Sequence, residues 1–139
     1  MKLAGIRVVD LSQFMPGPML ASNLADHGAD VIKLEPLSGE AARGSLESDS
    51  EFFVALNRGK RSIALDLKHP DGLAIARKLI DAADVVIESS RPGVAARLGI
   101  DYDTVSRTNA RLVYCSLTAF GQTGRLAQVP ARSRRAPGR

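Results

Sequence analysis

The sequence contains one cysteine, no tryptophan and no long hydrophobic run. A single cysteine, Cys115, cannot form a disulfide within the chain, and its position in the apolar run 112–117 predicts a buried structural thiol. No run of about eighteen apolar residues is present, and residues 1–10 lack the apolar core and cleavage site of a signal peptide. We therefore expect a soluble, cytoplasmic protein that does not span a membrane.

Acidic residues are absent after Gly124, so the excess of basic residues belongs to the end of the chain and not to residues 1–124. The chain carries 19 Lys and Arg against 15 Asp and Glu, a formal net charge of +4. Residues 1–124 hold 14 of the cations and all 15 acids, a net charge of −1. A nucleic-acid-binding domain needs a basic surface or stacking aromatics, and the chain has only 2 Tyr and 4 Phe. No nucleic-acid partner is expected.

Apolar runs separated by helical patterns predict the fold. A chain of 139 residues with 45% hydrophobic residues is long enough for one domain with its own core. Strands that alternate with helices, with no internal repeat, predict an α/β fold: a Rossmann-like, open, mostly parallel sheet with flanking helices. The expected strands are 6–11, 31–34, 63–67, 85–87 and 112–117, and the expected helices are 18–26, 70–82 and 103–108, the last with Asp101 as a candidate cap.

Two segments interrupt this alternation. Residues 36–51 are polar and contain glycine, and a connection of that length is often functional. From Arg125 onward the chain is rich in Ala, Pro, Ser and Arg and has no acid, so it can neither bury a face nor pair its charges. We expect a domain at 1–124, followed by a basic, disordered tail at 125–139.

Ligands bind beyond the carboxyl ends of the strands in such sheets, so the segments after the strands are the candidate site. The first contains Pro16-Gly17-Pro18, where a glycine and the start of a helix could admit an anion; a plain turn is the alternative. Residues 118–124 after the last strand form a polar, glycine-bearing loop suited to a substrate site.

Cations flank the third and fourth strands. Arg58, Lys60, Arg61 and Lys68 would attract a polyphosphate if they share one edge, and would otherwise be a solvated face. Arg91, in an Arg-Pro-Gly turn, could bind a phosphate or stack on an adenine, or could close a helix terminus.

The sequence shows none of the usual catalytic motifs: no G-x-G-x-x-G, no phosphate-binding P-loop, no metal-ligand spacing and no G-x-S-x-G. His27 and His69 lie at a predicted helix end and just before Pro70, where structural or solvent-facing roles are expected. The acids near strand ends also have ordinary partners. Asp10 and Glu35 can accept hydrogen bonds from loops, Asp66 can pair with Lys60 or Arg61, and Glu88 can pair with Arg91.

Taken together and in order, these segments resemble the class III CoA-transferases, the CaiB/BaiF family. The resemblance runs over about 120 residues, and several weak motifs in register make it specific. Family members move CoA between carboxylic acids or, in the α-methylacyl-CoA racemase branch, epimerise the carbon next to the thioester. The matching segments are Gly5 to Asp10, Pro16-Gly17-Pro18, Leu24 to Pro36, Asn57 to Lys68, Arg91-Pro92-Gly93 and Gly121 to Gly124.

The resemblance implies coenzyme A or acyl-CoA as the bound substrate, carboxylic acids as co-substrates, and an interlocked homodimer in full-length relatives. Pro36 departs from relatives that place an arginine after the acid of the second strand, so one nucleotide contact is missing. The positions that match CoA contacts of the family are Gln13, Met15, Leu65, Lys68, Arg91 and Arg97.

The resemblance also implies what this chain lacks. Transferases of the family use an aspartate beyond the glycine loop as nucleophile, and racemases place a histidine and an aspartate in that region. No acid or histidine follows Gly124 here, so no catalytic residue is assigned. We expect the N-terminal part of an acyl-CoA:carboxylate CoA-transferase that binds CoA and is inactive alone. The alternatives are part of a racemase and a non-catalytic CoA-binding module.

Overall fold

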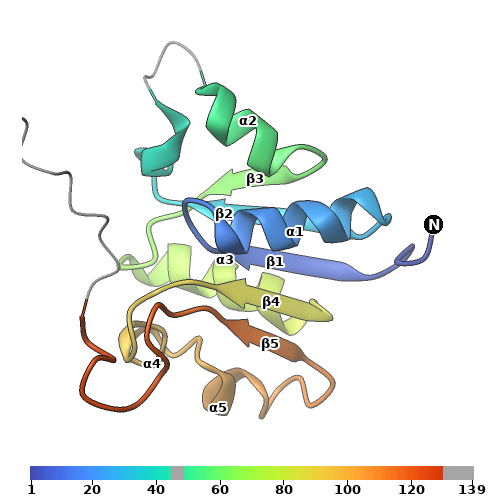
Figure 1. Cartoon of the computed structure of the whole chain (residues 1–139). Helices are drawn as coiled ribbons and strands as arrows, with labels where there is room; N and C mark the ends of the chain where they lie inside the picture. Colours follow the sequence, from blue (N-terminus) through green and yellow to red (C-terminus); the bar gives the residue numbers. More distant parts are fainter. Residues whose placement is uncertain (45–48, 130–139) are drawn as a thin grey trace, which may run out of the picture.

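The computed structural model describes residues 1–44 and 49–129 of the chain. Within them, a sheet of five parallel strands has the order β3-β2-β1-β4-β5 (Figure 1), which confirms the predicted open parallel α/β sheet. The sequence did not indicate this strand order. The strands are β1 (Arg7–Leu11), β2 (Asp30–Glu35), β3 (Arg61–Ala64), β4 (Val85–Glu88) and β5 (Val113–Ser116).

The strand order reverses beside β1, and this positions the site. The chain moves outward from β1 through β2 to β3, then returns to the other side of β1 for β4 and β5. The loops after β1 and β4 therefore diverge at the carboxyl edge of the sheet, and ligands bind in α/β sheets at such a switch point.

The helices follow the predictions at two positions and differ at three. Helices α1 (Pro16–Asp26) and α3 (Pro70–Asp81) agree with the expected ones, whereas α5 (Tyr102–Val105) is shorter than 103–108. Asp101 lies at the α5 N-cap, but its carboxylate accepts the Thr104 hydroxyl rather than a backbone N–H. Two helices were not predicted, α2 (Glu51–Asn57) and α4 (Val94–Leu98).

The described parts of the expected long loop, residues 36–44 and 49–51, contain a 3₁₀ turn, η1 (Ala41–Arg43), and the start of α2. The Ser50 hydroxyl caps α2 by accepting the Phe53 N–H at 3.1 Å. The Phe53 ring is buried under Arg43, whose guanidinium lies 4.1 Å from the ring centre. Burial of one aromatic side chain thus stabilises a helix too short for a clear sequence pattern.

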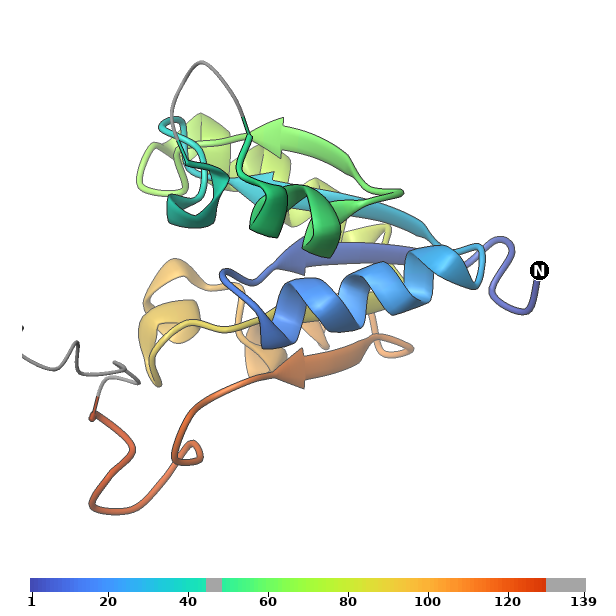
Figure 2. The same ribbon diagram turned by 45° about the horizontal axis from the view of Figure 1, so that its top comes forward.

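The helices cover both faces of the sheet, with α1 and α2 on one face and α3, α4 and α5 on the other (Figure 2). A hydrophobic core lies on each face of the sheet. Alternate residues of a strand belong to the two cores because successive side chains point to opposite faces. Val8 and Val31 pack with Ala21 of α1. On the other face, Val9 packs with Ile80 of α3.

No helix in the described residues is long and apolar enough to cross a membrane. The expected basic tail, 125–139, lies mostly outside the described residues; residues 125–129 form turns without a helix or strand. Cys115 is half-buried against the α1 core rather than fully buried, and it is a free thiol.

Candidate functional site

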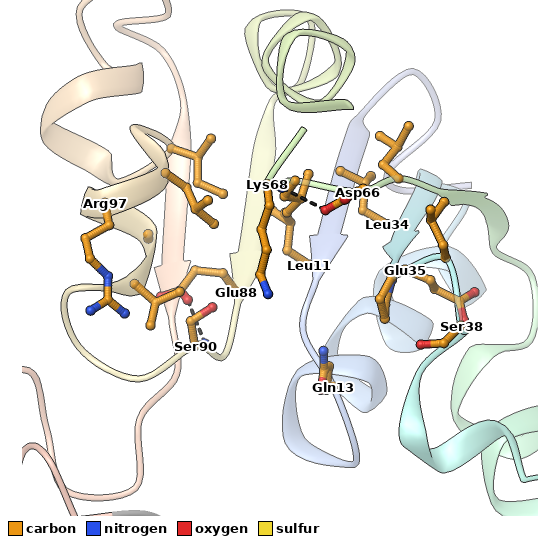
Figure 3. A pocket seen from close by; sticks show the side chains of 18 residues that line it. Leu11, Gln13, Leu34, Glu35, Ser38, Asp66, Lys68, Glu88, Ser90 and Arg97 are labelled. Carbon is orange, nitrogen blue, oxygen red and sulfur yellow. Dashed lines mark hydrogen bonds between the residues drawn. The ribbon is translucent and has the colours of Figure 1, made fainter. Parts of the chain in front are cut away.

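A cavity of about 640 Å³ opens at the carboxyl edge of the sheet, where the strand order reverses (Figure 3). Its volume lies within the roughly 300–1,000 Å³ typical of small-molecule sites. Leucine and isoleucine side chains from the strand ends and α4 form its walls, and polar side chains stand among them. The residues that line it include Leu11, Gln13, Leu34, Glu35, Pro36, Ser38, Leu65, Asp66, Lys68, Glu88, Ser90, Arg97, Leu98 and Ile100.

Two cations of this cavity, Lys68 and Arg97, come from different elements. Lys68 follows β3 and Arg97 lies on α4; both side chains are exposed. In Figure 3 the Lys68 side chain extends into the middle of the cavity, and Arg97 lies to one side of it. Neither forms an ion pair with a described residue. Their charges are therefore available to an anionic ligand.

The structure brings four of the six sequence-predicted CoA contacts into one cavity: Gln13, Leu65, Lys68 and Arg97. Arg91 lies in a neighbouring cavity of about 410 Å³, which shares Glu88 and Ala95 with the first. Met15 lines neither cavity; it is the N-cap residue of α1 and is 52% exposed.

The cation cluster expected around β3 does not form a single patch. Arg61 stands at the amino-terminal end of β3 and pairs with Asp30 at 2.6 Å. Arg58 pairs with Asp26. The Lys60 side chain is buried and its ammonium lies 2.8 Å from Asp10; burial lowers the pKa of Lys60, and Asp10 opposes this effect. Three of the four cations are thus neutralised within the protein, and Lys68 alone of the four reaches the cavity.

The Pro16-Gly17-Pro18 turn is the first turn of α1 and offers few donors to an anion. Pro16 and Pro18 have no N–H, and the Met19 N–H already donates to the Met15 carbonyl at 2.9 Å. Gly17 is buried, and a Cβ at this position would lie 2.2 Å from the Ser12 side chain. Internal packing therefore requires the glycine, so the expected anion site at this helix start is not supported.

Glu35, at the end of β2, is held on all sides by the protein. The Arg43 guanidinium donates to its two oxygens at 2.6 and 2.7 Å, and the Ser62 hydroxyl and the Glu40 N–H donate as well. Burial by itself would raise the pKa of Glu35, but the hydrogen bonds from Arg43, Ser62 and Glu40 lower it to about 2. The expectation that loop groups satisfy this carboxylate is confirmed.

Two predicted acid pairings are wrong. The Asp66 carboxylate accepts the Lys68 N–H at 2.9 Å, because Lys60 and Arg61 are engaged elsewhere. Glu88 is buried and accepts the Ser90 N–H at 2.7 Å and the Ser116 hydroxyl. The Asp66 carboxylate thus serves the local turn after β3, whereas Glu88 contacts both the segment after its own strand and the neighbouring strand β5.

The remaining candidate groups are structural. His69 is the N-cap of α3, where its Nδ1 accepts the Asp71 N–H, and His27 is the C-cap of α1, as expected for helix ends. In the described part of the chain, no group of three or more His, Cys, Asp or Glu is arranged to hold a metal ion.

Sequence reasoning missed Glu40 and Ser89, which hold the loop after β1. The Glu40 carboxylate accepts the Phe14 N–H, and the Ser89 hydroxyl accepts the Gln13 N–H, each at 2.9 Å. An acid in a polar loop has the same sequence signature as a solvated one, so no local signal identified Glu40. Ser89 stands after β4, where the switch-point rule points, but serine is common in loops.

Comparisons with known proteins agree with this geometry. The family model described as CoA-transferase family III matches residues 3–134. The chain is 47% identical over 133 residues to a succinate–glutarate CoA-transferase of Agrobacterium fabrum, a match that covers 88% of this chain and 33% of the relative. It is 44% identical over 131 residues to an acetyl-CoA:oxalate CoA-transferase of Acetobacter aceti, covering 91% of this chain and 34% of the relative.

A solved structure of a CaiB/BaiF family protein from Brucella suis superimposes with a TM-score of 0.87 at 38% identity, covering 91% of this chain and 35% of that one. The chain thus spans about a third of the length of the curated relatives it matches. Since the family model matches nearly the whole chain and the solved relative has the same fold, the chain belongs to CoA-transferase family III.

Proposed function

We propose that this chain binds the nucleotide end of coenzyme A in the cavity at the carboxyl edge of the sheet. The observation that carries the proposal is a pair of exposed cations beside apolar walls, Lys68 and Arg97, which form no ion pair with the residues that the structure describes. Coenzyme A combines several phosphate charges with an adenine ring. Lysine and arginine form charge-assisted hydrogen bonds with phosphates, and leucine side chains suit the ring.

The charged and apolar side chains that line the cavity suggest how the ligand is oriented. Asp66 and Glu88 line the cavity with the cations, so phosphates are favoured at Lys68 and Arg97 and disfavoured beside the carboxylates. The adenine then lies against Leu65 and the neighbouring leucines. Gln13 also lines the cavity and can donate or accept a hydrogen bond. Arg91 and Met15 stay predicted contacts outside this cavity.

A dinucleotide such as NAD is a poorer fit to the same sheet. Dinucleotide-binding folds use a glycine-rich turn after β1 and an acid at the end of β2 that binds a ribose hydroxyl. Here the turn carries two prolines, and the acid at that position, Glu35, already accepts from Arg43, Ser62 and the Glu40 N–H.

For the whole protein, we infer transfer of CoA between acyl-CoA and carboxylic acids. The relatives described above are named for succinate, glutarate, acetyl-CoA and oxalate, which favours a transferase over an α-methylacyl-CoA racemase. The isolated chain is proposed to bind CoA without turning it over. The four carboxylates near the strand ends each accept hydrogen bonds or ion pairs from the protein, which leaves none poised as a nucleophile; they are Asp10, Glu35, Asp66 and Glu88.

Calorimetric titration of the 139-residue chain with CoA, dephospho-CoA and NAD tests the binding proposal. Lys68→Ala and Arg97→Ala should each weaken CoA binding by about 1.5–3 kcal/mol, the usual contribution of a hydrogen bond to a charged group, or roughly 10- to 150-fold in Kd. Lys78→Ala and Arg107→Ala are matched controls, because both side chains are exposed and neither lines the cavity. NAD should bind more weakly than CoA. No measurable CoA binding by the wild-type chain would refute the proposal.

A further inference from the structure

A cluster of four buried charges lies under the loop that follows β1. The side chains of Asp10, Lys33, Glu40 and Lys60 are each at most 2% exposed. The Lys33 ammonium lies 2.6 Å from the Glu40 carboxylate, and the Lys60 ammonium lies 2.8 Å from that of Asp10. Burying ion pairs costs more solvation than apolar side chains of similar size would, so the cluster is poorly explained by stability alone.

Glu40 connects this cluster to the loop at a strained position. Its second carboxylate oxygen accepts the Phe14 N–H at 2.9 Å. Phe14 has a φ of +64°, in the left-handed region that a residue with a large side chain rarely adopts. Its ring is exposed, so side-chain burial does not hold the backbone in this conformation. The contact with Glu40 offsets part of the conformational cost.

Glu40 also belongs to the segment after β2, part of which lines the cavity. Its own N–H donates to Glu35 at 3.2 Å, and the residues before it, 36–38, line the cavity. On the other side of Phe14, Gln13 lines the cavity and donates its N–H to Ser89 after β4. Successive amides of one loop are thus tied to the segments that follow β2 and β4.

We propose that Glu40 is a positioning residue that sets the geometry of this cavity before the ligand arrives. The carboxylate fixes the segment containing Gln13 relative to residues 36–38, which removes an ordering cost from binding. The proposal rests on the proposed binding of CoA in this cavity. It assigns no contact between Glu40 and the ligand.

A matched pair of double variants tests the role of the acceptor oxygen. Lys33→Met/Glu40→Gln removes both charges but keeps an oxygen for the Phe14 N–H, whereas Lys33→Met/Glu40→Leu removes the charges and the acceptor. Hydrogen exchange of the Phe14 amide and the Kd for CoA are measured on both, with melting temperature as the control for global stability. Both variants lose the 2.9 Å hydrogen bond from the Lys33 ammonium to the Ser12 carbonyl, so they are compared with each other, and the glutamine variant should keep Phe14 protection and CoA affinity. The leucine variant should lose both, each by about tenfold for one hydrogen bond.

Equal exchange or equal CoA affinity in the two variants overturns the proposal, because either result leaves Glu40 with a purely structural role. The wild type supplies a test that does not depend on the variants folding. Its Phe14 amide must already be protected without CoA, and exchange at the rate of an open loop would overturn the proposal. The wild-type chain could fail to bind CoA although the Phe14 amide is protected through Glu40. In that case the proposed ligand is wrong, but Glu40 still holds the loop after β1.

Discussion

The Glu35–Arg43 pair should make the stability of this chain depend on pH in a defined window. The hydrogen bonds that lower the pKa of Glu35 from 4.5 to about 2 favour the charged form in the folded state. A carboxylate with a lowered pKa stabilises the fold above its unfolded pKa, and this contribution is lost as the pH falls through the folded value. The window therefore runs from about pH 4.5 down to about pH 2.

The size of the effect follows from the same contacts. A pKa lowered from 4.5 to about 2 corresponds to about 3 kcal/mol. The Arg43 side chain is 30% exposed, so solvent screening reduces the expected contribution to about 2 kcal/mol. Urea unfolding followed by circular dichroism at pH 7, 5, 4 and 3 measures it, each result being a free energy of unfolding.

Glu35→Gln removes the titrating group, so its free energy of unfolding should change less than that of wild type between pH 5 and pH 3. The matched control is Glu51→Gln, at an exposed acid of the first turn of α2, which should follow the wild-type curve closely. Equal losses of unfolding free energy in Glu35→Gln and wild type over this interval would contradict a stabilising role for the charged Glu35.

Two further predictions concern packing and chemistry. Gly17→Ala should lower the free energy of unfolding by about 1–3 kcal/mol, since its Cβ would clash with the Ser12 side chain. An unchanged free energy of unfolding in urea would show that the Ser12 side chain moves aside at no cost. The 139-residue chain should neither transfer CoA from acyl-CoA to free acids nor exchange an α-proton in deuterated water between pH 5 and 9. Turnover by purified chain that disappears on changing a single one of the four strand-end carboxylates to Ala would contradict this.

The sheet was predictable because buried parallel strands leave a strong local signal. Residues 85–87 are apolar and nearly coincide with β4, whose Val86 and Ile87 are buried, as in a strand covered by helices on two faces. The mostly apolar run 112–117 contains β5, an edge strand that is only partly buried. Helix α2 was not predictable in the same way, since its stability depends on packing of Phe53 against Arg43 rather than on a repeated pattern.

The topology of the sheet made the position of the candidate site predictable, but not the pairing of its charged side chains. Segments after strands meet at one edge of a parallel sheet, and this rule brought Lys68 and Arg97 to the same cavity. It could not show that Lys60 reaches back to Asp10, fifty positions away, or that Arg61 stands at the opposite end of its strand. Charge pairing over such separations depends on side-chain reach in the folded chain, which sequence spacing does not encode.

Arg43 uses nearly every binding surface of its guanidinium, and this constrains how the protein can change. Two nitrogens contact Glu35, a third contacts Asp49, and the planar face lies over Phe53. A lysine offers one point charge and no planar face, so it can satisfy only part of this arrangement. Among homologues, positions 35 and 43 should therefore either both be retained or change together, and a lysine at position 43 should be rare wherever a glutamate remains at position 35.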